Sequence, residues 1–155
     1  MTNFHLAQLN IARILAPMDS PTMAGFAARL DDINALADSA PGFVWRLQTE
    51  SGNATEIKAF NDDWLLVNMS VWESVEQLKT FTYNTAHAEV MRQRRQWFEP
   101  HTEMYMALWW IPAGHIPTVE EAKERLSHLQ KNGESEYAFT FKRVFSAPRT
   151  EIQMQ

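Results

Sequence analysis

Alternating hydrophobic and polar positions predict strands in several parts of this chain, separated by segments with helical periodicity. The expected strands cover residues 4–12, 43–49, 64–72, 104–111 and 137–145, and a short strand near 57–60 is a further candidate. The third is the clearest, because its side chains divide into two faces. One face carries Leu65, Val67, Met69 and Val71, and the other carries Trp64, Leu66, Asn68, Ser70 and Trp72.

Four helices are expected between these strands, each marked by residues that start or stop a helix. Ser20 and Pro21 start the first, and apolar residues recur at helical spacing until Pro41. Capping boxes at 74–77 and 118–121 start two more helices, the second of which ends at Asn132-Gly133. Another helix is expected from Thr85 until Pro100.

The resulting order is β-α-β-β-α-β followed by an added α-β, which predicts an α+β, ferredoxin-like antiparallel sheet. We expect a single domain over residues 1–155, with a core at about 4–146 and a loose tail at 147–155. Such a sheet carries helices on one face and leaves its other, here largely apolar, face open. A homodimer through the open sheet face is therefore predicted.

Composition excludes several classes of function. The net charge of −5 argues against a nucleic-acid partner, and no apolar run approaches the length of a membrane span. With no cysteine, the chain has no disulfide, thiolate metal site or thiol nucleophile. Its five glycines are too far apart for a phosphate-binding loop. No secretory signal is visible, so we expect a cytoplasmic protein.

Several short strings resemble an uncharacterised bacterial family, domain-of-unknown-function family 3291, over roughly residues 4–148. They lie at residues 32–38, 41–48, 71–74, 94–98, 108–112, 114–115 and 138–141. The resemblance implies a dimeric α+β barrel. Relatives of that superfamily include quinone-forming monooxygenases of antibiotic biosynthesis, haem-degrading monooxygenases, peroxidase-like folds and muconolactone isomerases.

The resemblance also implies site residues. Quinone-forming oxygenases use an Asn and a Trp four apart on the third strand, which here match Asn68 and Trp72. Haem-degrading enzymes use an Asn on the first strand, a Trp ending the third strand and a following His as iron ligand. Asn10, Trp72 and His87 match that pattern, although the gap from Trp72 to His87 is longer than in those enzymes.

Strand periodicity places Trp64, Asn68 and Trp72 on one face. An amide and an indole N–H there can hold a phenolate or quinone oxygen and stabilise negative charge. Alternatively, Asn68 bonds to the backbone and the two tryptophans pack against helices.

Helical spacing places His87 and Arg94 on one face, with Val90, Met91 and Trp97. There the histidine can act as acid, base or iron ligand, and Arg94 can hold a carboxylate. The alternative is a half-buried histidine beside a solvated basic run. Arg46 lies either at the mouth of a pocket or in an ion pair with an acidic residue.

These considerations predict a monooxygenase-like protein that oxidises or binds a flat aromatic or polyene ligand between sheet and helices. The expected catalytic residues are Asn68, Trp72 and His87, and the expected substrate-binding residues are Trp64, Arg94, Asn10 and Arg46. No metal site and no cofactor are expected, with haem as an alternative. Two other functions stay open: a non-catalytic ligand-binding or stress-related dimer, and an isomerase or lyase with His87 as base.

Overall fold

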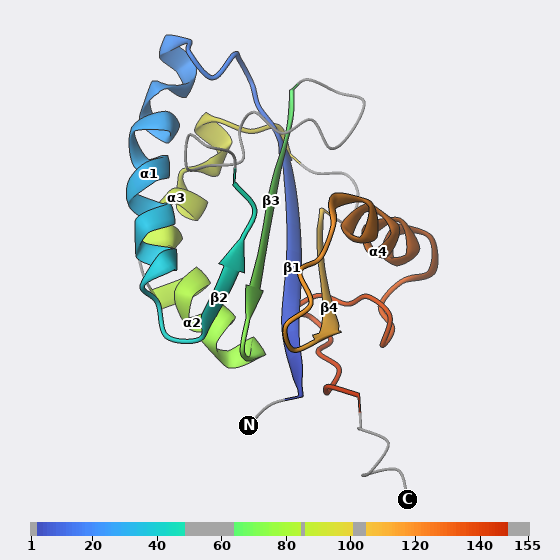
Figure 1. Cartoon of the computed structure of the whole chain (residues 1–155). Helices are drawn as coiled ribbons and strands as arrows, with labels where there is room; N and C mark the ends of the chain where they lie inside the picture. Colours follow the sequence, from blue (N-terminus) through green and yellow to red (C-terminus); the bar gives the residue numbers. More distant parts are fainter. Residues whose placement is uncertain (1–2, 49–63, 85, 101–104, 149–155) are drawn as a thin grey trace, which may run out of the picture.

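A computed structural model describes residues 3–48, 64–84, 86–100 and 105–148 of the chain (Figure 1). The candidate strand near 57–60 lies outside these residues. The elements follow one another as β1 (Phe4–Arg13), η1 (Pro21–Met23), α1 (Ala24–Asp38), β2 (Phe43–Arg46), β3 (Leu65–Trp72), α2 (Val75–Asn84), α3 (Ala86–Arg92), η2 (Arg94–Gln96), β4 (Met106–Pro112) and α4 (Val119–Asn132).

The strands of the described residues form one antiparallel sheet in the order β2-β3-β1-β4. The two central strands are β1 and β3, with Gln8 opposite Ser70 and Asn10 opposite Asn68. This order, with helices between the strands, confirms the predicted ferredoxin-like α+β fold.

Both predicted capping boxes start helices. The Ser74 hydroxyl accepts a hydrogen bond from the Gln77 backbone N–H at 3.2 Å, one residue before α2 begins. The Thr118 hydroxyl accepts from the Glu121 backbone N–H at 3.1 Å and caps α4. Each bond satisfies an N–H that a helix start leaves without a backbone partner.

Helices α1, α2 and α3 lie on one side of the sheet and α4 on the other (Figure 1). We call the side of the sheet that faces α1, α2 and α3 the helix-facing surface. It carries Leu6, Trp72 and Leu108, which pack against Val75, Leu78 and Phe81 of α2. The ordinary alternation of strand side chains therefore gives the sheet two separate apolar cores.

The second face of the sheet is covered within the chain. Leu126 and Leu129 of α4 pack against Leu9, Met69 and Trp109 there, and all five side chains are at most 2 % exposed. The sequence predicted an open apolar face at this place, and the structure instead uses the added helix to bury it. The apolar strand residues show only that this face of the sheet is buried. They do not show whether α4 or a second copy of the chain packs against it. The homodimer stays a prediction.

The predicted final strand at 137–145 is wrong. Within the described residues only Phe139 pairs with the sheet, in an isolated bridge to Leu108 of β4. The backbone then turns, with the Arg143 N–H donating to the Thr140 carbonyl at 3.2 Å, while the Glu134 carboxylate accepts the Thr140 N–H at 2.9 Å. Phe139 is nevertheless fully buried on the helix-facing surface, so burial rather than strand pairing explains the apolar pattern.

A carboxylate on α4 makes part of the stability depend on pH. Glu121 Oε2 accepts from the Trp109 indole N–H at 2.9 Å, and its Oε1 lies 2.7 Å from His115 Nε2. Burial raises the pKa of Glu121, but the hydrogen bonds from His115 and Trp109 and the charge of His115 together lower it below its ordinary value of 4.5. The ionised form is therefore the one that the fold favours.

Because the folded chain binds this proton more weakly than the unfolded chain, the contribution of Glu121 is complete above pH 4.5 and is lost as the pH falls through the lowered pKa. When the pH is lowered from about 6 to about 3, we expect the melting temperature of Glu121→Gln to fall less than that of the unchanged chain. The matched control is Glu120→Gln, because the Glu120 side chain is 85 % exposed. Melting curves of equal pH dependence in the two variants would contradict this role for Glu121.

Among the described residues, none of the helices has the length and apolar character needed to span a bilayer.

Candidate functional site

A row of polar side chains crosses the middle of the helix-facing surface. It runs over β1 and β3, where direct strand pairing places Asn10 beside Asn68 and Gln8 beside Ser70. On β2, Arg46 is the register partner of Ser70. Polar groups in the centre of a sheet face that is otherwise apolar need partners, since an unpaired buried polar group is costly.

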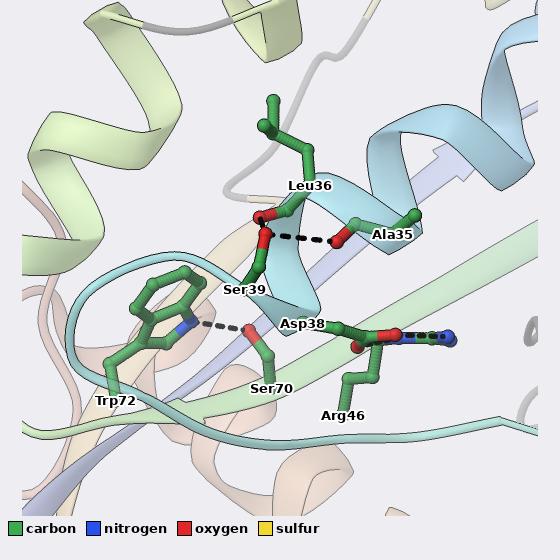
Figure 2. A network of polar contacts seen from close by, with 7 residues as sticks. All are labelled: Ala35, Leu36, Asp38, Ser39, Arg46, Ser70 and Trp72. Atoms are coloured by element: carbon green, nitrogen blue, oxygen red, sulfur yellow. Dashed lines mark hydrogen bonds and ion pairs between the residues drawn. The ribbon is translucent and has the colours of Figure 1, made fainter.

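Three of these side chains form one hydrogen-bonded chain with Trp72. We call the four residues the Asn68–Trp72 network: Asn68, Gln8, Ser70 and Trp72. Gln8 Nε2 donates to Asn68 Oδ1 at 2.7 Å and to Ser70 Oγ at 2.8 Å. The Trp72 indole N–H donates to the same Ser70 Oγ at 2.8 Å (Figure 2). One serine oxygen therefore links the buried indole to the amides nearer the surface.

The network runs from the core to solvent. Trp72 is 1 % exposed, Ser70 and Gln8 are 8 % and 7 % exposed, and Asn68 is exposed although it lies in a central strand. Ala37 is the one buried residue of α1, the first helix on this side of the sheet. The Asn68 Nδ2 group has no hydrogen-bond partner among the described residues. The Asn68 amide N–H donor is thus accessible, and the bond from Gln8 to Asn68 Oδ1 fixes the orientation of this amide.

An ion pair borders the network. Arg46 Nε donates to Asp38 Oδ1 at 2.7 Å, and Arg46 Nη2 donates to Asp38 Oδ2 at 3.3 Å (Figure 2). The Arg46 side chain is 12 % exposed and that of Asp38 is 47 % exposed. The two-point pairing joins the end of α1 to β2. Of the two interpretations of Arg46, the ion pair with an acidic residue is confirmed.

Trp72 lies deeper than a ligand-binding indole would. Its ring packs edge-on against Phe43, with centroids 5.5 Å apart, and against Phe81 at 5.2 Å. The Trp72 N–H is bonded to Ser70, so Trp72 affects a ligand only indirectly, through the hydrogen bonds of Ser70 and Gln8. Trp72 therefore positions the network and offers no N–H of its own to a ligand oxygen.

Trp64 lies one residue before β3, and its backbone carbonyl accepts the Ile14 N–H at 2.8 Å. Its ring is 38 % exposed and stacks with the guanidinium of Arg13, 5.7 Å from the ring centroid. The expected placement of Trp64 on one face with Asn68 and Trp72 stays a prediction. Asn10, in contrast, lies half-buried directly opposite Asn68.

The predicted helix face with His87 and Arg94 is also interrupted. α3 ends at Arg92, and Gln93 adopts φ −96° and ψ 4° before the separate turn η2. Because of this break, Trp97 is buried in a hydrophobic cluster with Ile14, while Arg94 is exposed. His87 belongs to α3, but its side chain lies outside the described part of the chain.

The sequence pattern did not identify Gln8, Ser70 and Asp38 as site residues. Two of them carried a signal, because Gln8 and Ser70 are polar residues on strand faces that are otherwise apolar. Asp38 carried none, since its role depends on where α1 meets β2. No three described histidine, aspartate or glutamate side chains gather closely enough to hold a metal ion.

Removing the central oxygen of the network is expected to cost stability. Ser70→Ala leaves the Trp72 indole N–H buried without an acceptor, and should lower the free energy of unfolding by about 1–3 kcal/mol. Urea denaturation followed by tryptophan fluorescence measures the change. Ser39→Ala is the matched control, because the exposed Ser39 hydroxyl makes bonds of 3.3–3.4 Å to helix carbonyls (Figure 2). An equal loss in both variants would contradict the network.

Comparison with known proteins identifies a family but no activity. A family model described as "Domain of unknown function (DUF3291)" matches residues 5–155. No curated protein matches the chain significantly. Two solved structures from Nitrosomonas europaea are similar to it: a protein of unknown function (12% identity, TM-score 0.46, covering 75% of this chain and 97% of that one) and a proposed antibiotic biosynthesis monooxygenase (13% identity, TM-score 0.45, covering 74% and 94%). Likeness at this level assigns no function.

Proposed function

The chain belongs to the DUF3291 family of unknown function, and we propose that it binds a flat small molecule over Asn68, on the helix-facing surface of its sheet. One observation carries this proposal. Asn68 is exposed in the middle of a central strand, while Gln8 holds its carbonyl oxygen from behind at 2.7 Å. A purely structural asparagine at such a place would be covered or would bond to the backbone.

The free amide group sets the polarity of the ligand. Because Asn68 Oδ1 accepts from Gln8, its Nδ2 is the group left to face a ligand, and it donates. It therefore suits a carbonyl or a phenolate oxygen. Apolar side chains beside the polar row, including the half-buried Leu66 and Met106, suit the ring of a flat aromatic or polyene molecule.

Oxidation of the bound molecule is the catalytic form of this proposal. A donor fixed in place stabilises negative charge on a ligand oxygen without reorganising during the reaction. An electron-rich phenolate or enolate held in this way can react as a carbanion or radical with molecular oxygen. Asn68 is then the residue that contacts the reacting molecule, and Gln8, Ser70 and Trp72 position it.

Haem fits the described residues poorly. In the constellation that the family resemblance implies, Trp72 is one of the haem-site residues, but here its ring is covered by Phe43 and Phe81 and its N–H bonds to Ser70. We derive no step through haem. A haemin titration without a Soret shift is the expected result.

Binding without chemistry is the second candidate function. It is favoured by the composition of the Asn68–Trp72 network, in which no side chain ionises near neutral pH. The isomerase or lyase alternative depends on His87, and oxygen-independent turnover is its distinguishing outcome.

The direct test is to identify what the purified protein carries. We expect native mass spectrometry of the unchanged chain to show a retained flat ligand, and Asn68→Leu to lose it. Oxygen uptake on adding the extracted ligand then separates oxidation from simple binding. Asn132→Ala is the matched control, since it removes an amide at the exposed end of α4. Equal retention by Asn68→Leu would contradict the proposal.

A further inference from the structure

An open groove lies between the end of α2 and the α3–η2 segment, and it shares no residue with the Asn68–Trp72 network. We call it the arginine groove. The described residues that line it are Tyr83, Ala88, Met91, Arg92, Arg94 and Arg95. Its volume of about 360 Å³ is within the usual range for sites that hold small molecules.

The cations of the groove are only partly neutralised. Three of the nine arginines of this acidic chain fall within residues 92–95. Arg92 pairs with Glu89, one turn earlier on α3. Arg94 and Arg95 are exposed, and in the part of the chain that the structure describes neither has an acidic partner. Because both side chains are exposed, a ligand can reach two guanidinium groups here in a chain of net charge −5.

The lining of the groove also includes aromatic and apolar side chains. The Tyr83 ring is 51 % exposed and is supported by Phe141, whose ring centroid lies 5.9 Å away. Lys79, one helical turn before Tyr83, holds its ammonium group 5.8 Å from the same Phe141 ring. Met91, half-buried, offers a deformable surface to a flat ligand.

We infer that the arginine groove is a second binding site, and that its ligand is a planar aromatic carboxylate. A guanidinium binds a carboxylate through two parallel hydrogen bonds, which suits Arg94 and Arg95. An exposed tyrosine ring stacks with an aromatic ring. A solvated basic run would explain the charges, but it would not explain an exposed aromatic ring lining the same hollow.

The test uses 2-naphthoate as the probe, measured by calorimetry and by shifts of the Ala88 and Met91 backbone amides in NMR spectra. We expect a Kd of about 1 mM or tighter for the unchanged chain. Arg94→Gln and Arg95→Gln should each weaken binding about tenfold, and Tyr83→Ala should do so several-fold. Lys131→Gln, which removes an exposed positive charge from α4, is the matched control and should bind normally.

Three outcomes would overturn the inference. The first is no binding of 2-naphthoate at about 10 mM, and the second is unchanged affinity in the Arg94→Gln/Arg95→Gln double variant. The third is equal affinity for acetate or for the neutral 2-naphthylmethanol, because the site needs both ring and charge. Asn68→Leu should leave the 2-naphthoate shifts of the Ala88 and Met91 amides unchanged, so failure at Asn68 and failure at the groove are distinguishable.

Discussion

Trp72→Ala should lower the free energy of unfolding by about 3–5 kcal/mol, the largest stability change expected for any substitution in the candidate site. The Trp72 ring is buried between Phe43 and Phe81, and its removal leaves a cavity that these rings cannot fill without moving. The substitution also leaves Ser70 Oγ with one donor fewer. Urea denaturation with circular dichroism as readout measures the change.

Two further variants separate packing from hydrogen bonding. Trp72→Phe keeps a ring in the core and loses the N–H, so we expect a smaller loss of about 1–3 kcal/mol. Combined with Ser70→Ala, its effect should be non-additive by about 1 kcal/mol, since both substitutions break one bond. Trp64→Ala is the matched control and should cost less than about 1 kcal/mol, because that ring is exposed. Equal losses from Trp64→Ala and Trp72→Ala would contradict the burial argument.

Asn68→Leu is expected to weaken binding of 2-naphthol, a flat probe with an acidic hydroxyl, by about a hundredfold. The substitution removes the amide donor and places a branched apolar group where the ligand oxygen would lie. Because Asn68 is exposed, the free energy of unfolding should change by only about 1 kcal/mol. Fluorescence titration measures the affinity.

The matching controls test the hydrogen bond itself. The methyl ether of 2-naphthol should bind the unchanged chain more weakly than 2-naphthol does, and Asn68→Leu should remove this preference. Asn132→Ala should bind both compounds as the unchanged chain does. If Asn68→Leu binds 2-naphthol normally, the ligand does not lie over Asn68.

Local signals in the sequence predicted much of the fold. The alternation in β3 and the capping boxes at Ser74 and Thr118 depend on contacts within a few residues, and the structure confirms them. The final strand was wrong because its prediction rested on apolar spacing alone. Phe139 is apolar because it is buried, and the backbone turns directly after it, where the Arg143 N–H donates to the Thr140 carbonyl.

The site was less predictable, because it depends on how distant segments meet. The pairing of Gln8 with Ser70 follows from the register of β1 against β3, which joins residues 62 positions apart. The break at Gln93 that separates Trp97 from Arg94 leaves no proline or glycine in the sequence as a signal. Asn68 could be predicted as a site residue, because a polar residue within an apolar strand pattern is recognisable from the sequence alone.

The most direct test of the Asn68 site is an NMR titration that follows side-chain amide groups. We predict that 2-naphthol shifts the Asn68 Nδ2 resonances first and most strongly, with smaller shifts for Gln8 Nε2 and the Trp72 indole N–H behind it. Unchanged Asn68 resonances at saturation, with shifts confined to residues elsewhere, would contradict the proposed function.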